Sequence, residues 1–405
     1  MKHIICSLYI SCLLLCLTFH TLMAQNQTYL PTSMYGIGEL TTSDGGRYAG
    51  MGQIGIALNR QGFLNVQNPA ALTRLDTIGF NFDIGLSAKH SQYAFLSNKS
   101  SGTTANPNRL SMAVRLNRRW FAMIGASPYS STGYLIQTEE PIEGAPDSYI
   151  NSLFEGEGGL YRCYLSNAFI LSRGLSIGAT VGMVMGTVTQ SETQEGASIK
   201  YESFRRGFYT DFGLHYEFAT KRKYQWSVGV IFAPSLILPH ENDLIYNNTS
   251  TSEELETSYH SPTQYLPMRI GVGIGVTSER WLLTADYNYM DWKRNKSNYA
   301  SVKYENQHRV NIGSIYMTNP RKPHSAELMG GIGMGNSYIV LKNRQMYYLE
   351  ANIGVSLPIQ HSYLSLGMSW RRQLNTRKQL MQETSWGLHL NLTFGEKLYG
   401  KRRVN

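Results

Sequence analysis

Residues 174–186 read GLSIGATVGMVMG, and this stretch decides the fold because its side chains alternate in character from one position to the next. The apolar set comprises Leu175, Ile177, Ala179, Val181, Met183 and Met185. The small or polar set between them comprises Ser176, Gly178, Thr180, Gly182 and Gly186, with Val184 as the exception. A repeat of two residues indicates a β-strand with one apolar face, whereas a helix would repeat every ~3.6 residues.

The same alternation recurs after residue 76, in runs separated by turn residues. Clear examples are 110–116, 270–276 and 388–394. Strands are expected to begin near 77, 108, 119, 158, 174, 204, 224, 264, 281, 304, 323, 346, 362 and 385. The pattern therefore predicts an all-β chain with fourteen antiparallel strands, and closing them into a barrel would remove the exposed edges.

Three features favour a transmembrane barrel over a soluble sandwich. Short connections alternate with long ones, which are expected near 139–157, 191–203, 239–263 and 293–303. Aromatic side chains near strand ends suit interfacial girdles: Trp120, Tyr224, Trp226, Trp281, Trp292, Tyr347, Tyr363, Trp370 and Trp386. The opposite strand face carries polar residues, which predicts a polar network in the lumen formed by Arg115, Asp211, Glu217, Asp286 and Arg309.

Composition agrees with this interpretation. Only 16% of the 405 residues are charged, against ~25% in typical soluble domains, while Gly (38) and Tyr (27) are abundant. Residues 1–24 are expected to be a signal peptide, which would remove Cys6, Cys12 and Cys16 and leave Cys163 without a disulfide partner. The remaining net charge is too small and scattered to indicate a nucleic-acid partner.

The chain is expected to divide into four parts. After the signal peptide, residues 25–76 are Gly-rich without clean alternation and are predicted to form an N-terminal plug, or hatch. Residues 77–394 form the barrel, and residues 395–405 form a basic tail. An even number of strands places both ends on the same side, predicted to be the periplasm for a barrel in the outer membrane of a Gram-negative cell.

Several motifs resemble the FadL/OmpP1/TodX family of outer-membrane channels for hydrophobic compounds, in its Bacteroidota-type branch. They are RYAGMG (47–52), GIAL (55–58), NPAAL (68–72), SPYSSTGY (127–134) and ADYNYMDW (285–292). The resemblance implies that Asn68, Pro69 and Ala70 belong to the hatch motif. It also implies a lateral opening at Ser127, Pro128 and Tyr129, where the family interrupts its third strand. The alternative is that Pro128 merely ends that strand before a loop.

The resemblance implies passive transport of a hydrophobic small molecule, with outer-membrane lipid around the barrel. One departure puts that in doubt, because the longest loop is polar and acidic, including Glu241, Asp243, Glu253, Glu254 and Glu256. The alternative is a non-transporting subunit of a secretion or assembly complex, as in PorV-like relatives, which would hold other outer-membrane or periplasmic proteins.

An enzyme is not expected. Residues 174–178 match the spacing of a hydrolase nucleophile elbow, but Ser176 would lie inside a strand instead of at a strand-to-helix turn. The dispersed histidines lack zinc-ligand spacing, so neither a metal nor a cofactor is expected.

Overall fold

The computed structural model describes residues 28–41, 46–52, 54–58, 60, 62–75, 79–95, 98–142, 145–219, 224–248, 253–297, 299–320, 325–359, 362–374 and 381–397. The predicted signal peptide and most of the predicted basic tail lie outside these residues. The described part of the chain contains no helix with the length and hydropathy needed to cross a bilayer.

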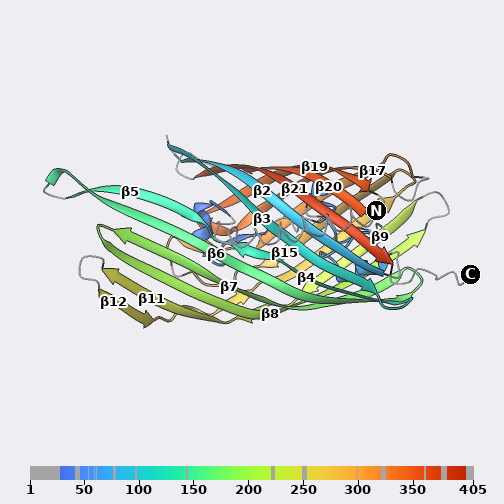
Figure 1. The fold of residues 1–405 in the computed structure, drawn as a ribbon, viewed down its shortest axis with the longest axis horizontal. Coiled ribbons are helices and arrows are strands. Elements are labelled where there is room, and N and C mark those ends of the chain that lie inside the picture. The colour runs from blue at the N-terminus through green and yellow to red at the C-terminus, as the bar shows by residue number, and fades with distance from the viewer. Residues whose placement is uncertain are drawn as a thin grey trace, which may run out of the picture.

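Fourteen antiparallel strands form a closed barrel, which confirms the predicted fold class (Figure 1). The barrel closes because the first strand pairs with the last, from Gly79 opposite Lys397 to Ala94 opposite Gln382. The strands are β2 (Gly79–Phe95), β3 (Asn98–Arg115), β4 (Trp120–Ser131), β6 (Ala145–Ser172), β7 (Leu175–Gln194), β8 (Ala197–Ala219), β9 (Gln225–Ala233), β14 (Met268–Thr277), β15 (Trp281–Asp291), β17 (Gln307–Met317), β18 (Glu327–Leu341), β19 (Arg344–Ile359), β20 (Ser362–Leu374) and β21 (Gln382–Lys397).

Three segments that were expected to be loops are largely strand, and those expectations were wrong. Residues 139–157 fall mainly in β6 and its partner β5 (Tyr134–Ile142), and 191–203 belong to β7 and β8. Residues 239–263 contain the hairpin of β11 (His240–Asn248) and β12 (Glu253–Ser258). Together these strands extend one side of the wall well past the rest of the barrel, on the left of Figure 1. We call this six-stranded extension, formed by β5, β12, β11 and the adjoining parts of β6, β7 and β8, the projecting sheet.

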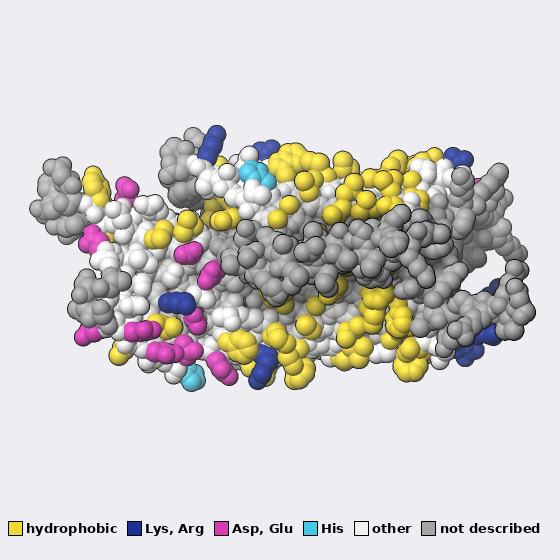
Figure 2. All heavy atoms as spheres, in the orientation of Figure 1, with side chains coloured by type: hydrophobic (Ala, Val, Ile, Leu, Met, Phe, Trp, Pro, Cys, Tyr) yellow, Lys and Arg dark blue, Asp and Glu magenta, His cyan; other side chains and the backbone are white. Residues whose placement is uncertain are grey.

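The wall separates apolar from polar side chains as the alternation predicts. Along β7, Ile177 and Val181 are 37% and 53% exposed on the outside, whereas Ser176 and Thr180 are buried on the inside. Yellow side chains accordingly gather on the barrel surface above and below the grey residues in Figure 2. Val184, the exception in the pattern, is fully buried within an apolar cluster inside the barrel. An apolar outer surface around a polar interior is the arrangement of a transmembrane barrel.

Two of the predicted girdle aromatics pack against residues of the protein instead of standing in an outer girdle. Trp292 is only 1% exposed and stacks on Tyr338, with the ring centroids 4.1 Å apart. Tyr363 lies under the guanidinium group of Arg47, 3.3 Å from the ring centroid to Cζ. By contrast, Trp120, Tyr224, Trp281 and Trp386 are exposed on the outside, as a girdle requires.

The segment before the barrel contacts inward-facing side chains around the whole wall. It contains the 3-10 helices η2 (Pro31–Met34), η3 (Ala49–Met51) and η4 (Pro69–Arg74) and the two-residue strand β1 (Glu39–Leu40). Apolar residues of this segment pack with residues of the strands in two buried clusters. Smaller elements elsewhere are the two-stranded sheet of β10 (Leu236–Leu238) and β13 (Gln264–Leu266), and β16 (Val302–Tyr304).

Candidate functional site

The wall has a break in strand pairing between β3 and β4. These strands pair only from Leu110 opposite Ala126 to Arg115 opposite Phe121. Beyond that point β3 continues against β2, and β4 continues against β6 with a register shift between Pro128 and Ser130. Proline lacks an N–H and so cannot complete a ladder, which fits its position at an irregularity. Ser127, Pro128 and Tyr129, the residues of the predicted lateral opening, therefore stand at the edge of this break.

The N-terminal segment reaches the broken edge from inside the barrel. Its strand β1 pairs with β4, with Glu39 opposite Ser131 and Leu40 opposite Ser130. The amide of Thr41 also donates to the carbonyl of Tyr129, at 3.0 Å. The edge of β4 therefore receives its partner from the N-terminal segment where it no longer receives one from β3.

Asn68, Pro69 and Ala70 form a buried turn that is fixed to the wall. The Oδ1 atom of Asn68 accepts from the Ala70 amide at 3.0 Å and caps η4, where proline at the first position is favoured. Its Nδ2 atom donates to the carbonyl of Ile56 at 2.7 Å and to that of Leu214 in β8 at 3.2 Å. One side chain thus joins two turns of the N-terminal segment to the barrel.

Buried carboxylates on three strands hold the lower part of the N-terminal segment, near the short turns of the barrel. Asp286 of β15 accepts from the amides of Gly55 and Ile56, at 2.7 and 2.8 Å. Glu217 of β8 forms an ion pair with Arg74. Asp286 and Glu217, both predicted to lie in a polar lumen, therefore bind this segment instead of facing an open channel.

The third carboxylate, Glu327 of β18, was not predicted as a site residue. It is completely buried and receives Arg47 at 2.8 Å on Oε2 and Arg60 at 2.5 Å on Oε1. Arg47 also donates to Ser356 Oγ at 3.0 Å and lies over the ring of Phe63. Arg47 belongs to the RYAGMG motif, but the sequence carries no signal that it pairs with Glu327, because the two residues are 280 positions apart.

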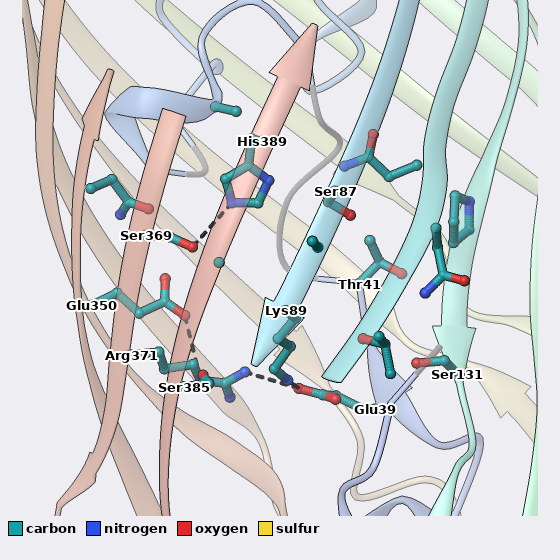
Figure 3. A pocket seen from close by; sticks show the side chains of 18 of the residues that line it. Glu39, Thr41, Ser87, Lys89, Ser131, Glu350, Ser369, Arg371, Ser385 and His389 are labelled. Atoms are coloured by element: carbon teal, nitrogen blue, oxygen red, sulfur yellow. Dashed lines mark hydrogen bonds and ion pairs between the residues drawn. The ribbon is translucent and has the colours of Figure 1, made fainter. Parts of the chain in front are cut away.

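A second charged cluster, around Glu39 of β1, lies in the lumen farther from the short turns of the barrel (Figure 3). Its carboxylate binds Lys89 of β2 at 2.7 Å and Arg371 of β20 at 3.2 Å, and accepts from Thr28 at 2.5 Å. Burial alone would raise the pKa of Glu39, but Lys89 and Arg371 lower it to about 2. Glu39 is therefore ionised at neutral pH and fastens β1 to two strands on the side of the barrel beside the broken edge.

This cluster lines a cavity of about 130 Å³ that also reaches the break in the wall. Polar residues from β3 and β21 line it further, including Asn106, Asn108 and His389. Figure 3 shows Lys89, Glu39, Arg371 and Glu350 converging at one end of this cavity, with Ser369 and His389 at the other.

A second cavity of about 130 Å³ lies on the other side of Leu40 and Thr41, which line both. It brings together four predicted site residues: Pro128, Tyr129, Asp211 and Arg309. Arg162 and Arg269 complete its charged lining. Arg309 also forms an ion pair with Glu350, whereas Arg115 lies apart at the β3–β4 turn, where its Nε donates to the carbonyl of Asn117.

Both cavities are small, and charged side chains stand among the apolar and polar residues that line them. Pockets that enclose drug-sized molecules measure ~300–1,000 Å³ and are mostly apolar. Within the described residues, no three His, Cys, Asp or Glu side chains are arranged to hold a metal ion. Ser176, the residue with nucleophile-elbow spacing, lies within β7 and accepts from the Thr73 hydroxyl at 3.0 Å. The geometry therefore describes an N-terminal segment joined to the barrel wall by buried hydrogen bonds and ion pairs.

No curated protein matches this chain. Among solved structures it resembles a deletion mutant of the monoaromatic hydrocarbon channel TodX (TM-score 0.62, 14% identity, covering 86% of this chain and 97% of that one). It also resembles the toluene transporter TbuX of Ralstonia pickettii (TM-score 0.58, 15% identity, covering 86% of this chain and 98% of that one). A FadL homologue of Pseudomonas aeruginosa is similar as well (TM-score 0.58, 11% identity, covering 88% of this chain and 99% of that one). At these identities the likeness confirms the predicted FadL/TodX type of fold; the Bacteroidota-type and PorV-like refinements stay predictions.

One family model spans nearly the whole chain, from residue 4 to residue 405, and its description is BamG. The chain therefore belongs to the BamG family.

Proposed function

We propose that this barrel is a non-transporting subunit that holds protein partners in an outer-membrane assembly or secretion complex. The observation that carries the proposal is the set of contacts that the N-terminal segment makes with the inside of the barrel. Buried ion pairs and hydrogen bonds from Glu327, Asp286 and Glu217 fix the N-terminal segment at one level, and Glu39 fixes it at another. Two cavities beside this segment are about 130 Å³ each, and charged side chains contribute to the lining of both.

The charged side chains in these linings also oppose passage of a hydrophobic molecule. An apolar ligand gains nothing from contact with ionised groups and would strip them of their polar partners. Moving the segment aside would in addition leave Glu327 buried without Arg47 and Arg60, and breaking such a pair costs ~3–5 kcal/mol. A hatch that closes the lumen, formed by residues 25–76, is part of this proposal.

The apolar belt supports a location in the outer membrane. Short turns at one end and long hairpins at the other support an orientation with both chain termini in the periplasm and the projecting sheet outside the cell. Residues 1–24 would then be the export signal removed on the way.

Purification in mild detergent, followed by quantitative mass spectrometry, tests the proposed function. We expect a second protein to be recovered in a fixed molar ratio to the barrel. Recovery of the barrel alone with a bound lipid-like molecule would contradict the scaffold and favour a channel.

Transport of a hydrophobic small molecule is the second candidate, and the break between β3 and β4 favours it. Both cavities reach Pro128 at this break, so a path from lumen to bilayer would be short. Cross-linking β1 to β4 through a Leu40→Cys, Ser130→Cys pair would close that path, because the two positions are register partners. Uptake of a hydrophobic probe into cells that falls on oxidation of this pair would support transport; unchanged uptake would exclude the path.

A further inference from the structure

The projecting sheet has two faces of opposite character. Cross-strand partners define the rows, because residues directly opposite one another share a face. The row on the barrel-mouth side runs Ile136, Phe154, Glu192, Ile199, Tyr246 and Leu255, through five successive strand pairings. Five of these six side chains are apolar, and they form a stripe across the whole width of the sheet.

The inward direction of this stripe follows from Gln190. Its Nε2 atom donates to the carbonyl of Met34 in the N-terminal segment, at 2.8 Å, so Gln190 faces the lumen. Glu192 lies two residues further along the same strand and therefore shares that face. We call the face containing Ile136, Phe154, Ile199, Tyr246 and Leu255 the mouth face.

The opposite face is acidic. Its rows contain Glu155, Lys200 and Glu256, and then Glu157, Glu202 and Asp243. Over the whole projecting sheet, Lys200 and Arg205 are outnumbered by Glu139, Glu140, Glu155, Glu157, Glu192, Glu195, Glu202, Glu241, Asp243, Glu253, Glu254 and Glu256. Figure 2 shows the acidic side chains gathered where these strands leave the barrel. The chain as a whole is basic, with a formal net charge of +9, whereas the net charge of the projecting sheet is negative.

The mouth face has no counterpart within the described residues. None of its five apolar side chains belongs to either buried apolar cluster, and Leu255 is 64% exposed. Because the sheet projects past the rest of the barrel, these side chains would meet water instead of lipid. An apolar stripe in water at the rim of a polar surface is typical of a protein-binding site.

We propose that the mouth face binds a segment of a second protein that presents apolar side chains flanked by lysine or arginine. Charge selects this occupant. A second copy of this chain would bring the same acidic sheet and be repelled, and anionic lipid headgroups would be repelled as well. Glu192 within the stripe, and Glu140 and Glu253 beside it, are the carboxylates placed to meet the basic residues. The inference rests on the proposed scaffold function and assigns its surface.

Photo-cross-linking with the full-length protein in cells tests the proposal. The photoreactive residue benzoylphenylalanine replaces Phe154 in one variant and its chain neighbour Leu153, on the opposite face, in the other. We expect the Phe154 variant to give at least ~10-fold more cross-linked protein, with the attachment point in an apolar segment bearing Lys or Arg. Equal yields, or attachment to lipid or to another copy of this chain, would overturn the proposal.

A matched pair of double variants supplies the second readout. Phe154→Asp with Tyr246→Asp changes the mouth face, whereas Leu153→Asp with Ile245→Asp changes the adjacent outward positions. We expect the amount of partner recovered in mild detergent to fall at least ~10-fold for the mouth-face variant and to stay unchanged for the outward variant. For the wild-type protein, we expect less partner to be recovered when the salt concentration rises from roughly 0.1 to 0.5 M. Retention of a heat-modifiable band in gel electrophoresis checks that each barrel is folded.

The outcomes separate the two proposals. If the mouth-face variant keeps a stoichiometric partner, the scaffold stands and the assignment of its surface is wrong. If the wild-type protein has no partner, the proposed function itself is wrong.

Discussion

Glu327 shows how a single residue holds the N-terminal segment in place. It is fully buried and contacts two arginines, Arg47 and Arg60, which come from separate turns of the segment. Removing one partner of such a group leaves the others buried and uncompensated, which costs far more than loss of a surface pair.

We therefore expect Glu327→Gln to loosen the hatch without unfolding the barrel. The predicted loss is ~3–5 kcal/mol in the free energy that holds residues 47–60 in place. Hydrogen exchange of the Met51 and Ile54 amides measures it. Glu305→Gln is the control, because Glu305 pairs with Lys293 at an exposed site where such pairs contribute ~0–1 kcal/mol. Equal exchange in the two variants would contradict the role of Glu327.

The lowered pKa of Glu39 predicts that the stability of the N-terminal segment around β1 depends on pH. Its pKa is lowered from the ordinary 4.5 to about 2, so its contribution to stability is complete above pH 4.5 and is lost as the pH falls through about 2. Protection of the Leu40 and Thr41 amides should therefore fall between pH 4.5 and 2, after correction for intrinsic exchange. Glu39→Gln should lower that protection already at neutral pH and flatten its dependence over this range; an unchanged profile would contradict the assignment.

At the scale of elements, close contact between strands and hatch depends on particular glycines. A Cβ atom at Gly331 of β18 would collide with the carbonyl of Met51, whereas at the adjacent Gly330 the nearest atoms would be 3.9 and 4.0 Å away. The sequence shows both glycines in the same run, and only the inward direction of Gly331 distinguishes them.

Gly331→Ala is therefore expected to displace η3 and speed up hydrogen exchange at Ala49–Met51, whereas Gly330→Ala should leave both unchanged. Overpacking of this kind typically costs ~1–3 kcal/mol. Similar exchange in the two variants would show that the hatch does not press on β18.

The strands themselves could be predicted from sequence, because lipid outside and polar groups inside impose a repeat of two at every membrane-crossing strand. The expected start of β7 at 174 and of β20 at 362 agree with the observed Leu175 and Ser362 within a residue. The projecting sheet was not predicted because it extends past the rest of the barrel, where an outer face need not be apolar. Glu155, Glu157 and Glu202 are then acceptable on its outer face, and the segment reads as a polar loop.

The contacts of the site were beyond prediction for a different reason. Asp286 and Glu217 were expected in the lumen because alternation places them there. Their partners at Gly55, Ile56 and Arg74 depend on how the hatch turns inside the barrel, and no periodic pattern constrains that path. Glu39 and Glu327 could not be predicted as site residues for the same reason, since the partners of each lie far away in the chain.

At the scale of the whole molecule, the protein is a barrel whose lumen we propose to be closed and whose distinctive surface is the projecting sheet. The fold resembles that of hydrocarbon channels, and ion pairs inside the barrel join the N-terminal segment to the wall. The proposed function lies on the outside of the barrel, at the surface where we propose that partners bind.

The most direct test is the electrical conductance of the purified protein in a planar lipid bilayer, compared with a variant that lacks residues 28–75. The account predicts no conductance steps from the wild-type protein and clear steps from the deletion variant, whose lumen would fill with water. Steps of similar size from both proteins would contradict the central claim that the hatch closes the barrel.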